Sequence, residues 1–545
     1  MKITIKRSSG FRFLYVLMFL CFTEHAQAVV WQWSVSLEGH ISNETKSNPT
    51  AFLWIPEDCN QVRAIVFSQQ NMCEETLFEH ATFRKTMSEL GFAVVWVSPG
   101  IDYRWNTATG SQDVFDNMLE DLADVSGYTE IKHVPIVPLG HSAMATFPWN
   151  FAAWNPARTL AVVSYKGDAP RTNLTGYGKE NLEWGRTRNI DGIPGLMIEG
   201  EYEWWEARVN PALAFRMMYP ESCISFLCDR GQGHFDVSDK VVDYISLFLR
   251  KAAKYRLPEN QSLDKPVALT KINPKDGWLA GRWDANVQKR EKAAPFSQYK
   301  GNERDAFWYF DQQIAEATES YYKESPGKEL RYIGFVVKGK LLPFATASHA
   351  QYTMTPELQK DLTFNIAAVF TDSSHNQPST TSSLKEKIRI SKINGPVKQL
   401  DDTTFVLDFY RTGMNNPRRT GDIWLLAHSE EDDLFKSTVQ QINIRIPYPL
   451  NEGERQYILF PGLPDVKYGT KEMTLNATSD KGLGVSYYVK EGSAKIEGNK
   501  LVFTKLPPRT KFPVKVTVVA WQYGHATGDK IQSAPAVERS FYITN

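Results

Sequence analysis

Short apolar runs alternate with amphipathic stretches along the first half of the chain. Seven of these runs have the length and composition of strands that are buried on both faces of a sheet. They cover residues 50–56, 63–68, 92–99, 134–140, 160–167, 195–200 and 223–228. Stretches with a helical spacing of apolar positions lie at residues 81–91, 111–127 and 238–255. This alternation predicts an α/β domain with a mostly parallel sheet over residues 29–262.

The stretch 111–127 shows how such a helix is read from the sequence. Val114, Met118, Leu122 and Val125 recur at a spacing of three to four residues and are expected to share one buried face. Ser111 is expected to cap the first turn, and Gly127 to end the helix.

The pattern changes after residue 258. A polar segment follows, and residues 263–330 are interpreted as a linker with one helical stretch at 303–322. From residue 331 onward short strand-like runs are separated by turn residues. This spacing predicts two β-sandwich domains, over residues 331–450 and 451–545.

The N-terminal residues have the pattern of an export signal. Basic residues precede the apolar stretch 13–22, which is too short to span a bilayer as a helix, and the small residues Ala26 and Ala28 follow it. We expect residues 1–28 to be a signal peptide cleaved after Ala28, and the mature protein to be exported to the periplasm or outside the cell. No later segment is long and apolar enough to predict a transmembrane helix.

Charge and cysteine content exclude several classes of protein. The chain has 62 basic and 62 acidic residues, without the basic excess that a nucleic-acid-binding protein shows. Four cysteines remain after the signal peptide, too few for a disulfide scaffold of this length. Cys223 and Cys228 are expected to point to opposite faces of one strand and not to pair. No metal-binding or phosphate-binding motif is found, so no metal and no cofactor are expected.

Ser142 is the candidate nucleophile. It stands in Gly140-His141-Ser142, directly after an apolar run and before a helical segment. A strand-to-helix turn of this kind lifts a serine hydroxyl above the sheet, and the N–H of Ala143 would then favour negative charge. The usual pattern is G-x-S-x-G, and Met144 stands here in place of the second glycine. We expect looser packing or an altered turn at that position.

The sequence also offers a base and an acid. His234 lies in a glycine-rich loop between the last strand and the closing helix, where it is expected to remove the serine proton. The acid should follow a strand between these two residues, and Glu203 is preferred, with Glu201 second and Asp168 third. It would hold the tautomer of the imidazole and stabilise the imidazolium. His141 is expected to pack beside the turn.

The order Ser142, Glu203, His234 is that of the α/β-hydrolases. Residues 50–256 resemble this superfamily in the "GHSAM" turn, the "EGEYE" acid loop and the "GQGHF" histidine loop. The resemblance implies a doubly wound, mostly parallel sheet and a second oxyanion donor after the third strand. Many relatives carry His-Gly there, whereas this chain has Gln69-Gln70-Asn71-Met72. The backbone of Gln70 or Asn71 is the expected donor, with the Asn71 side chain as a possible aid.

The layout as a whole is similar to exported bacterial esterases that act on plant polysaccharides and carry C-terminal Ig-like modules. This resemblance rests on the tail from "DVKYGTKEMTLNATSD" to "NKLVFTKL". It implies a carbohydrate esterase without a cofactor and with a polysaccharide as substrate. The leading expectation is a pectin methyl ester, followed by a sugar acetyl or feruloyl ester.

Side chains near the expected site fit a sugar substrate, although packing and surface solvation explain them equally well. Aromatic rings stack on sugars and guanidinium groups pair with uronate carboxylates. Only about 28 residues separate the strands at 160–167 and 195–200, which predicts an open cleft without a large lid. Two alternatives remain, a secreted serine peptidase of the same fold and a non-catalytic carbohydrate-binding protein. The candidate aromatic and arginine residues are Trp105, Tyr202, Trp204, Trp205, Arg171, Arg186, Arg188, Arg208 and Arg230.

Overall fold

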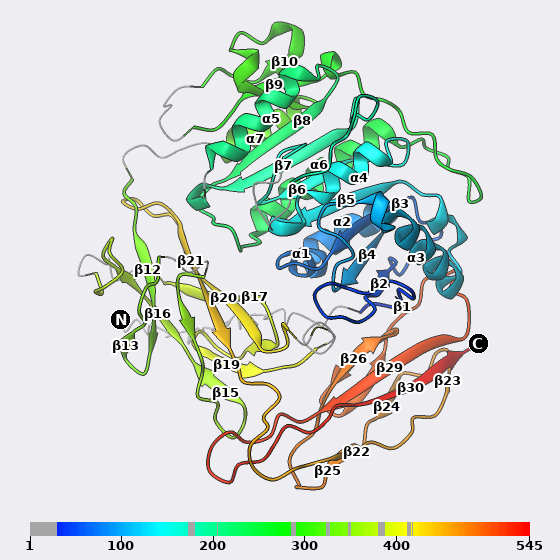
Figure 1. Cartoon of the computed structure of the whole chain (residues 1–545), viewed down its shortest axis with the longest axis vertical. Coiled ribbons are helices and arrows are strands. Elements are labelled where there is room, and N and C mark those ends of the chain that lie inside the picture. The colour runs from blue at the N-terminus through cyan, green and yellow to red at the C-terminus, as the bar shows by residue number, and fades with distance from the viewer. Residues whose placement is uncertain are drawn as a thin grey trace, which may run out of the picture.

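One twisted eight-stranded sheet organises the N-terminal part of the chain (Figure 1). The computed structural model describes residues 30–545 except 173–179, 204, 285–289, 323–327, 347–349, 380–386, 411–415 and 417. The expected signal peptide, residues 1–28, therefore lies outside the described residues. The strands of the sheet are β1 (Trp33–Ser36), β2 (Thr50–Trp54), β3 (Ala64–Gln69), β4 (Phe92–Ser98), β5 (Ile136–His141), β6 (Val162–Tyr165), β7 (Pro194–Gly200) and β8 (Cys223–Asp229).

The strand order is β1-β2-β4-β3-β5-β6-β7-β8. Strand β2 pairs antiparallel with both its neighbours, and every pair from β4 to β8 is parallel. Because parallel strands need crossovers, helices cover both faces of the sheet. The predicted α/β-hydrolase architecture is confirmed by this order, and the seven strands expected from the sequence are all present. We call residues 30–262 the α/β domain.

The two faces of the sheet bury different side chains, as alternation along a strand requires. Val66 of β3 packs in one core cluster together with the first, second and sixth helices. Phe67 points to the other face and packs against Phe115 of the third helix. The helices are α1 (Glu74–Glu79), α2 (Ala81–Leu90), α3 (Ser111–Ser126), α4 (Phe147–Trp154), α5 (Glu206–Met218), α6 (Asp239–Arg256) and α7 (Gln312–Tyr321).

Helix α3 corrects two details of the expectation from sequence. Its buried face is centred on Phe115, Met118 and Leu122, while Val125 is exposed, because the larger Phe115 sets which side of the helix turns inward. Ser111 is the first helical residue and donates its hydroxyl to Asp102, so it does not cap the helix. Gly127 ends the helix in the left-handed conformation, as expected.

The segment 263–330 is more than a linker. It contains a three-stranded sheet in the order β10-β9-β11 that packs on β8, and its helix α7 begins only at Gln312. The expected helix at 303–322 is therefore wrong in its first half. The apolar run Ala306–Tyr309 is fully buried as strand β11, and Asp311 caps α7 by accepting from the N–H of Ile314. The other two strands are β9 (Trp278–Gly281) and β10 (Ala294–Pro295).

The strands of residues 331–450, the middle β domain, form small sheets around one core. The sheets have the orders β13-β12-β16, β14-β21-β20-β17 and β15-β19-β18. Phe335, Phe405 and Ile442 come from different sheets and share one buried cluster, as in a β-sandwich. The strands are β12 (Tyr332–Val337), β13 (Lys340–Leu341), β14 (Thr353–Met354), β15 (Thr363–Asn365), β16 (Ala367–Thr371), β17 (Arg389–Asn394), β18 (Val397–Gln399), β19 (Thr404–Leu407), β20 (Asp422–Ser429) and β21 (Thr438–Arg445).

Residues 451–545, the C-terminal β domain, pack on the α/β domain near the end of helix α3. Arg509 donates to Glu130 at 2.8 Å, and the N–H of Lys511 donates to the carbonyl of Ser126 at 3.0 Å. In Figure 1 the strands of this domain lie below the α/β domain, on the side away from β8. They are β22 (Ile458–Leu459), β23 (Val466–Lys467), β24 (Glu472–Thr474), β25 (Thr478–Ser479), β26 (Ser486–Glu491), β27 (Ala494–Glu497), β28 (Lys500–Phe503), β29 (Val514–Trp521) and β30 (Val537–Thr544).

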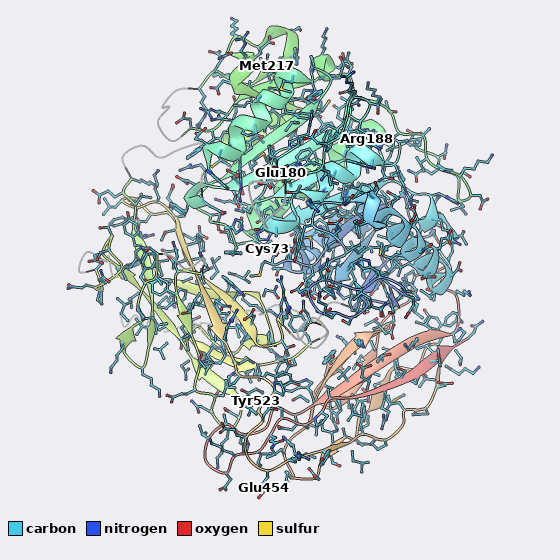
Figure 2. The ribbon with its side chains drawn as sticks, in the orientation of Figure 1. Cys73, Glu180, Arg188, Met217, Glu454 and Tyr523 are labelled. Carbon is cyan, nitrogen blue, oxygen red and sulfur yellow. The ribbon has the colours of Figure 1, made fainter. Side chains whose placement is uncertain are left out.

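The four described cysteines are free and buried, so Cys223 and Cys228 do not pair, as expected. Cys73 lies at the start of α1, on the side of the α/β domain that faces the β-rich part (Figure 2). Among the described residues, no helix has both the length and the apolar character needed to cross a membrane. Within the same residues, no cluster of three or more His, Cys, Asp or Glu side chains could hold a metal ion.

Candidate active site

Ser142 lies on a sharp turn at the carboxyl end of β5. The strand ends at His141, and a 3-10 turn begins at once over Ser142–Met144. The backbone of Ser142 has a φ of 53°, in the left-handed region that non-glycine residues rarely adopt. Such strain is typical of a serine held on a nucleophile turn. The first N–H groups of the turn, including that of Ala143, have no acceptor inside it.

Met144 does not loosen the turn, contrary to expectation. Its side chain is buried beside Gly100, where an added Cβ would lie 2.2 Å from Met144 Cε. Gly140 is equally constrained, because a Cβ there would lie 1.9 Å from the carbonyl oxygen of Met144. The missing glycine of the usual pattern is thus compensated by a glycine in the loop after β4.

His234 reaches Ser142 from the loop after β8. The distance between His234 Nε2 and Ser142 Oγ is 2.7 Å, which is hydrogen-bond distance. The loop is held by Asp236, whose carboxylate accepts the N–H of Gly233 at 2.5 Å and contacts Lys166 at 3.1 Å. A base is therefore in position to accept the serine proton.

Lys166 anchors the histidine loop from below. Its ammonium group is fully buried and lies 2.7 Å from Asp229, at the end of β8, as well as 3.1 Å from Asp236. Burial acts to lower the pKa of Lys166, but the two aspartates outweigh it and raise that pKa. Burial raises the pKa of Asp236 to about 6. A buried charge needs such partners, so this cluster fixes the loop only while it is complete.

Glu203 is the carboxylate that contacts the other side of the imidazole. It forms an ion pair with His234 Nδ1. Glu201 lies elsewhere, 3.8 Å from Arg230 and 3.5 Å from Lys436, and accepts the N–H of Gly231 at 2.8 Å. Of the two glutamates, the structure brings only Glu203 to the histidine.

Asp168, the third candidate acid, is buried beneath this contact and not beside the imidazole. It accepts the hydroxyl of Thr146 at 3.0 Å, and Arg208 Nε lies 3.6 Å away. The same guanidinium lies 3.4 Å from Glu199 and 3.7 Å from Glu203. Burial raises the pKa of Glu199 to about 8, with Arg208 opposing the shift. Arg208 therefore links three carboxylates and steadies Glu203.

His141 packs beside the turn, as expected. Burial lowers its pKa well below the usual range, and the neighbouring His234 lowers it further. The ring is therefore neutral. Its Nε2 donates to the carbonyl of His234 at 2.8 Å, which leaves Nδ1 as an acceptor, 3.4 Å from the amide of Asn71. His141 thus positions the histidine loop.

The backbone N–H groups expected to form the second oxyanion donor are engaged elsewhere. That of Gln70 donates to the carbonyl of Val97 at 2.8 Å, and that of Asn71 donates to Glu74 at 3.1 Å. The Asn71 side chain donates to the carbonyl of His141 at 2.9 Å. None of these groups points to an incoming oxyanion, because each already has an acceptor.

Glu74 explains this arrangement. Its carboxylate also accepts the N–H groups of Met72 at 2.8 Å and His141 at 3.0 Å, so it ties the loop after β3 to the residue before Ser142. Burial raises the pKa of Glu74 to about 7, and these donors oppose the shift.

The side chain of Gln70 offers a different donor. It is 2% exposed, and its Oε1 accepts from Ser98 Oγ at 2.8 Å and from Asn416 Nδ2 at 3.1 Å. Its Nε2 is buried and has no hydrogen-bond acceptor among the described residues. A buried N–H donor without an acceptor lowers the stability of the fold, so we expect the Gln70 amide to have a functional role.

The middle β domain contacts the loop after β3 directly. Arg419 donates to the carbonyl of Asn71 and lies 2.9 Å from Glu44. Asn394 donates to the carbonyl of Met72 at 2.9 Å. Together with the hydrogen bond from Asn416 to Gln70, these contacts fix the loop after β3 against the middle β domain.

The same domain also touches the acid and histidine loops. The hydroxyl of Tyr202, next to Glu203, donates to the carbonyl of Ser437. The ring of Phe235, next to His234, packs against Trp424 with 4.8 Å between centroids. The expected open cleft is therefore wrong, since Ser142 is only 6% exposed. Among the described residues, these contacts with the acid and histidine loops come from the middle β domain.

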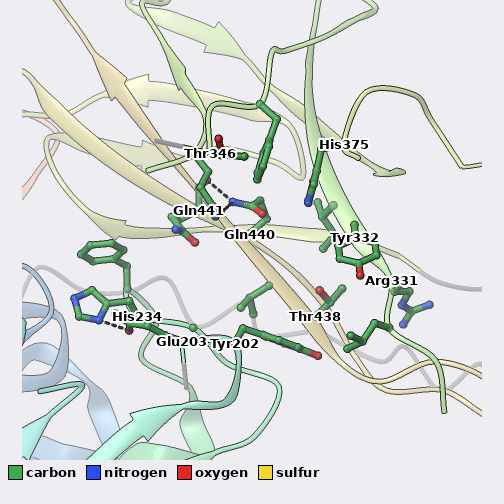
Figure 3. Close-up of a pocket in the computed structure, with 17 residues that line it drawn as sticks. Tyr202, Glu203, His234, Arg331, Tyr332, Thr346, His375, Thr438, Gln440 and Gln441 are labelled. Carbon is green, nitrogen blue, oxygen red and sulfur yellow. Dashed lines mark hydrogen bonds and ion pairs between the residues drawn. The ribbon is translucent and has the colours of Figure 1, made fainter. Parts of the chain in front are cut away.

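Two cavities flank the site. The larger, about 550 Å³, lies between the domains on the Glu203 side, and Figure 3 shows it with Glu203 and His234 at one end and Arg331 and Tyr332 at the other. The smaller, about 460 Å³, borders Ala143 and Met144 instead. Only the second cavity is lined by the residues that directly follow Ser142.

The candidate sugar-binding residues are mostly engaged. Trp105 is fully buried in the core, so it is not a stacking platform, while Tyr202 and Trp205 remain partly exposed. Trp204 lies outside the described residues. Arg208 and Arg230 pair with carboxylates of the site, as given above. Arg171 lies 3.4 Å from Glu183, Arg188 stacks over Trp154 at 4.4 Å, and Arg186 is exposed.

Comparisons with known proteins add only a likeness over part of the chain. No protein-family model matches the sequence, and no curated protein matches it. The solved structures that are similar to it include the following three. An S-formylglutathione hydrolase from Agrobacterium tumefaciens is 17% identical over 42% of this chain and 97% of that chain, with a TM-score of 0.30. Est1E from Butyrivibrio proteoclasticus is 15% identical over 41% and 99%, with a TM-score of 0.29. Poly(aspartic acid) hydrolase-1 from Sphingomonas sp. KT-1 is 12% identical over 41% and 99%, with a TM-score of 0.30. The strand order of the chain itself therefore carries the fold assignment.

Proposed function

We propose that this protein is a serine ester hydrolase in which Ser142 is the nucleophile, His234 the base and Glu203 the acid. The observation that carries the proposal is the 2.7 Å contact between His234 Nε2 and Ser142 Oγ on a strained turn. A serine hydroxyl attacks an ester only when a positioned base removes its proton. The ion pair of Glu203 with Nδ1 supports the tautomer that leaves Nε2 free to do so.

The proposed reaction has two steps. Ser142 Oγ attacks the ester carbonyl, its proton passes to His234, the C–O bond to the alcohol breaks, and the alcohol leaves with that proton. Water then attacks the acyl-enzyme in the same way, releasing the acid and restoring Ser142. The oxyanion of each step would be stabilised by the N–H of Ala143 and the side-chain amide of Gln70. The unmet, buried Nε2 of Gln70 supports this second role.

The first test is hydrolysis of p-nitrophenyl acetate by the wild type and by Ser142→Ala. We expect the variant to lose at least about 10⁴-fold in kcat, because the nucleophile is removed. Labelling by a fluorophosphonate, with the adduct mapped to residue 142 by mass spectrometry, identifies the nucleophile independently. A wild type that folds but shows neither hydrolysis nor labelling would contradict the proposal, and would favour the non-catalytic binding protein instead.

Within this class we propose a carbohydrate ester as the substrate, carried on plant cell-wall polysaccharide. The leading candidate is a methyl ester of pectin, and the next is an acetyl or feruloyl ester of a sugar. Exposed rings of Tyr202 and Trp205 next to Glu203 support sugar stacking. Release of methanol, acetate or ferulate from pectic and xylan fractions distinguishes these substrates. Cleavage of an unstructured protein in the same assay would favour the serine peptidase.

A further inference from the structure

Loops of the α/β domain line the cavity beside Ala143, as far as the described residues show. Its walls come from residues 40–44, the loop 100–104 after β4, and the start of α3. It holds about 460 Å³, which lies within the range of roughly 300–1,000 Å³ typical of small-molecule sites. Because it reaches Ala143, a group bound in it lies next to the proposed oxyanion.

Both carboxylates that line this cavity are already compensated. Glu44 lies 2.9 Å from Arg419. Asp102 accepts the backbone N–H groups of Arg104 at 3.0 Å and Asn106 at 2.6 Å, and the hydroxyl of Ser111 at 3.0 Å. Neither carboxylate is therefore available to neutralise a further cation without giving up these bonds.

Arg104 is the cation of the cavity. Its guanidinium donates to the backbone carbonyl of Glu180 at 2.9 Å, which is a neutral acceptor. Among the described residues, no carboxylate lies within ion-pair distance of it. Glu180 itself lies on the loop between β6 and β7 (Figure 2). A guanidinium has five N–H donors in a planar fork that matches a carboxylate, and one bond to a carbonyl leaves most of them unused.

We propose that this cavity is a subsite for an acidic sugar, in which Arg104 binds the free carboxylate of a uronate unit next to the ester. The inference rests on the proposed esterase function. It favours an esterified polyuronate with some carboxylates free over an ester of a neutral sugar, since a neutral ring would leave Arg104 without a counter-charge. Arg104 is then a residue that selects the substrate rather than one that takes part in bond breaking.

The test compares two pectins as substrates, one fully and one partly methyl-esterified, at equal concentrations of ester. In the wild type we expect kcat/KM for methanol release to be higher on the partly esterified pectin, and this preference to shrink as NaCl rises. Arg104→Gln should lower the ratio of the two kcat/KM values about tenfold, which is the size of one charge-assisted hydrogen bond. Arg104→Lys should keep part of the preference.

Arg63 provides the matched control. It lies just before β3, at the other end of the sheet, and its guanidinium also donates to a backbone carbonyl, that of Pro258 at 3.4 Å. Arg63→Gln should leave the ratio unchanged. An unchanged ratio in Arg104→Gln would overturn the proposal, and so would a wild type without any preference that depends on salt. If Arg104→Gln does not fold, the salt dependence of the wild type decides alone.

Failure of the inference and failure of the proposed function give different results. A wild type that hydrolyses p-nitrophenyl acetate but treats both pectins alike, or releases acyl groups only from neutral sugars, retains the esterase function and loses the Arg104 subsite. A wild type inactive on all esters overturns both.

Discussion

Glu203 and His234 form an ion pair between a carboxylate and an imidazole at the rim of the large sheet. We expect Glu203→Gln to lower kcat on p-nitrophenyl acetate by about 10³- to 10⁴-fold, because an amide can hold the imidazole in the wrong tautomer. Glu201→Gln is the control and should cost less than about tenfold, since Glu201 contacts Arg230 and Lys436 instead. Equal losses in both variants would contradict the assignment of the acid.

The amide of Gln70 provides a second prediction. Gln70→Glu keeps an oxygen for Ser98 and Asn416 but replaces the buried donor by a carboxylate oxygen. We expect kcat to fall about 10²- to 10³-fold with little change in KM, as for loss of one oxyanion donor. Asn71→Asp is not a suitable control, because the Asn71 amide donates to the carbonyl of His141. Gln69→Glu is the control instead. Its side chain contacts the loop after β4, so its effect on kcat measures the damage that an added buried carboxylate does to the structure. A Gln70→Glu enzyme with full activity would exclude the amide from the oxyanion site.

Arg419 tests whether the middle β domain positions the site. Arg419→Ala removes the bonds to Asn71 and Glu44, and small displacements of a reacting group can cost about 10²-fold. We expect kcat to fall about 10- to 100-fold with KM changed less, and Arg419→Lys to restore part of it. The exposed neighbour Arg418 is the matched control, and Arg418→Ala should behave as the wild type. A change confined to thermal stability would show a structural role only.

Glu199 predicts a dependence of stability on pH. Its pKa is raised from 4.5 to about 8 in the folded protein, so between these values the folded chain holds a proton that the unfolded chain has released. Stability therefore falls as pH rises from about 4.5 to about 8, with a slope of up to about 1.4 kcal/mol per pH unit. Glu199→Gln should lose this slope. Melting temperatures of both proteins at several pH values measure it, with the exposed Glu183→Gln as control, and parallel profiles would contradict the prediction.

Lys166 predicts a large loss of stability. Lys166→Met leaves Asp229 and Asp236 buried without their cation, and breaking a buried pair in this way costs about 3–5 kcal/mol. Denaturant unfolding should show this loss, and adding Asp236→Asn should recover part of it. A single variant as stable as the wild type would mean that the aspartates find other partners or are protonated.

Much of the fold could be predicted from the sequence because its signals are local. Seven buried strands and the helix ending at Gly127 follow from apolar runs and a single glycine. The expectation from sequence merges strand β11 with the helix because Ala306–Tyr309 lies only two residues before the start of α7 at Gln312. Only its pairing with β9, which is not local, decides that it is a strand.

The candidate site divides in the same way. Ser142, His234 and Glu203 could be placed from turn chemistry and their order along the chain, since each lies in the segment that follows a strand. Glu74, Lys166, Arg208 and Arg419 could not, because charged residues are common and only folding shows which of them become buried together. The acidic pair at Glu74 and Glu75, just after the third strand, is the one local signal that could have drawn attention to the loop. The backbone donors at Gln70 and Asn71 were misassigned because their acceptors come from other strands and helices.

The contact between Arg419 and Asn71 has a consequence for how the protein is made. The two residues are 348 positions apart, so the α/β domain leaves the ribosome long before the part of the middle β domain that carries Arg419. The N-terminal portion can therefore build its sheet early, while the loop after β3 still lacks its contact with Arg419. We therefore expect the proposed ester hydrolysis to reach its full rate only late in synthesis, and to be slow in a chain cut after residue 262.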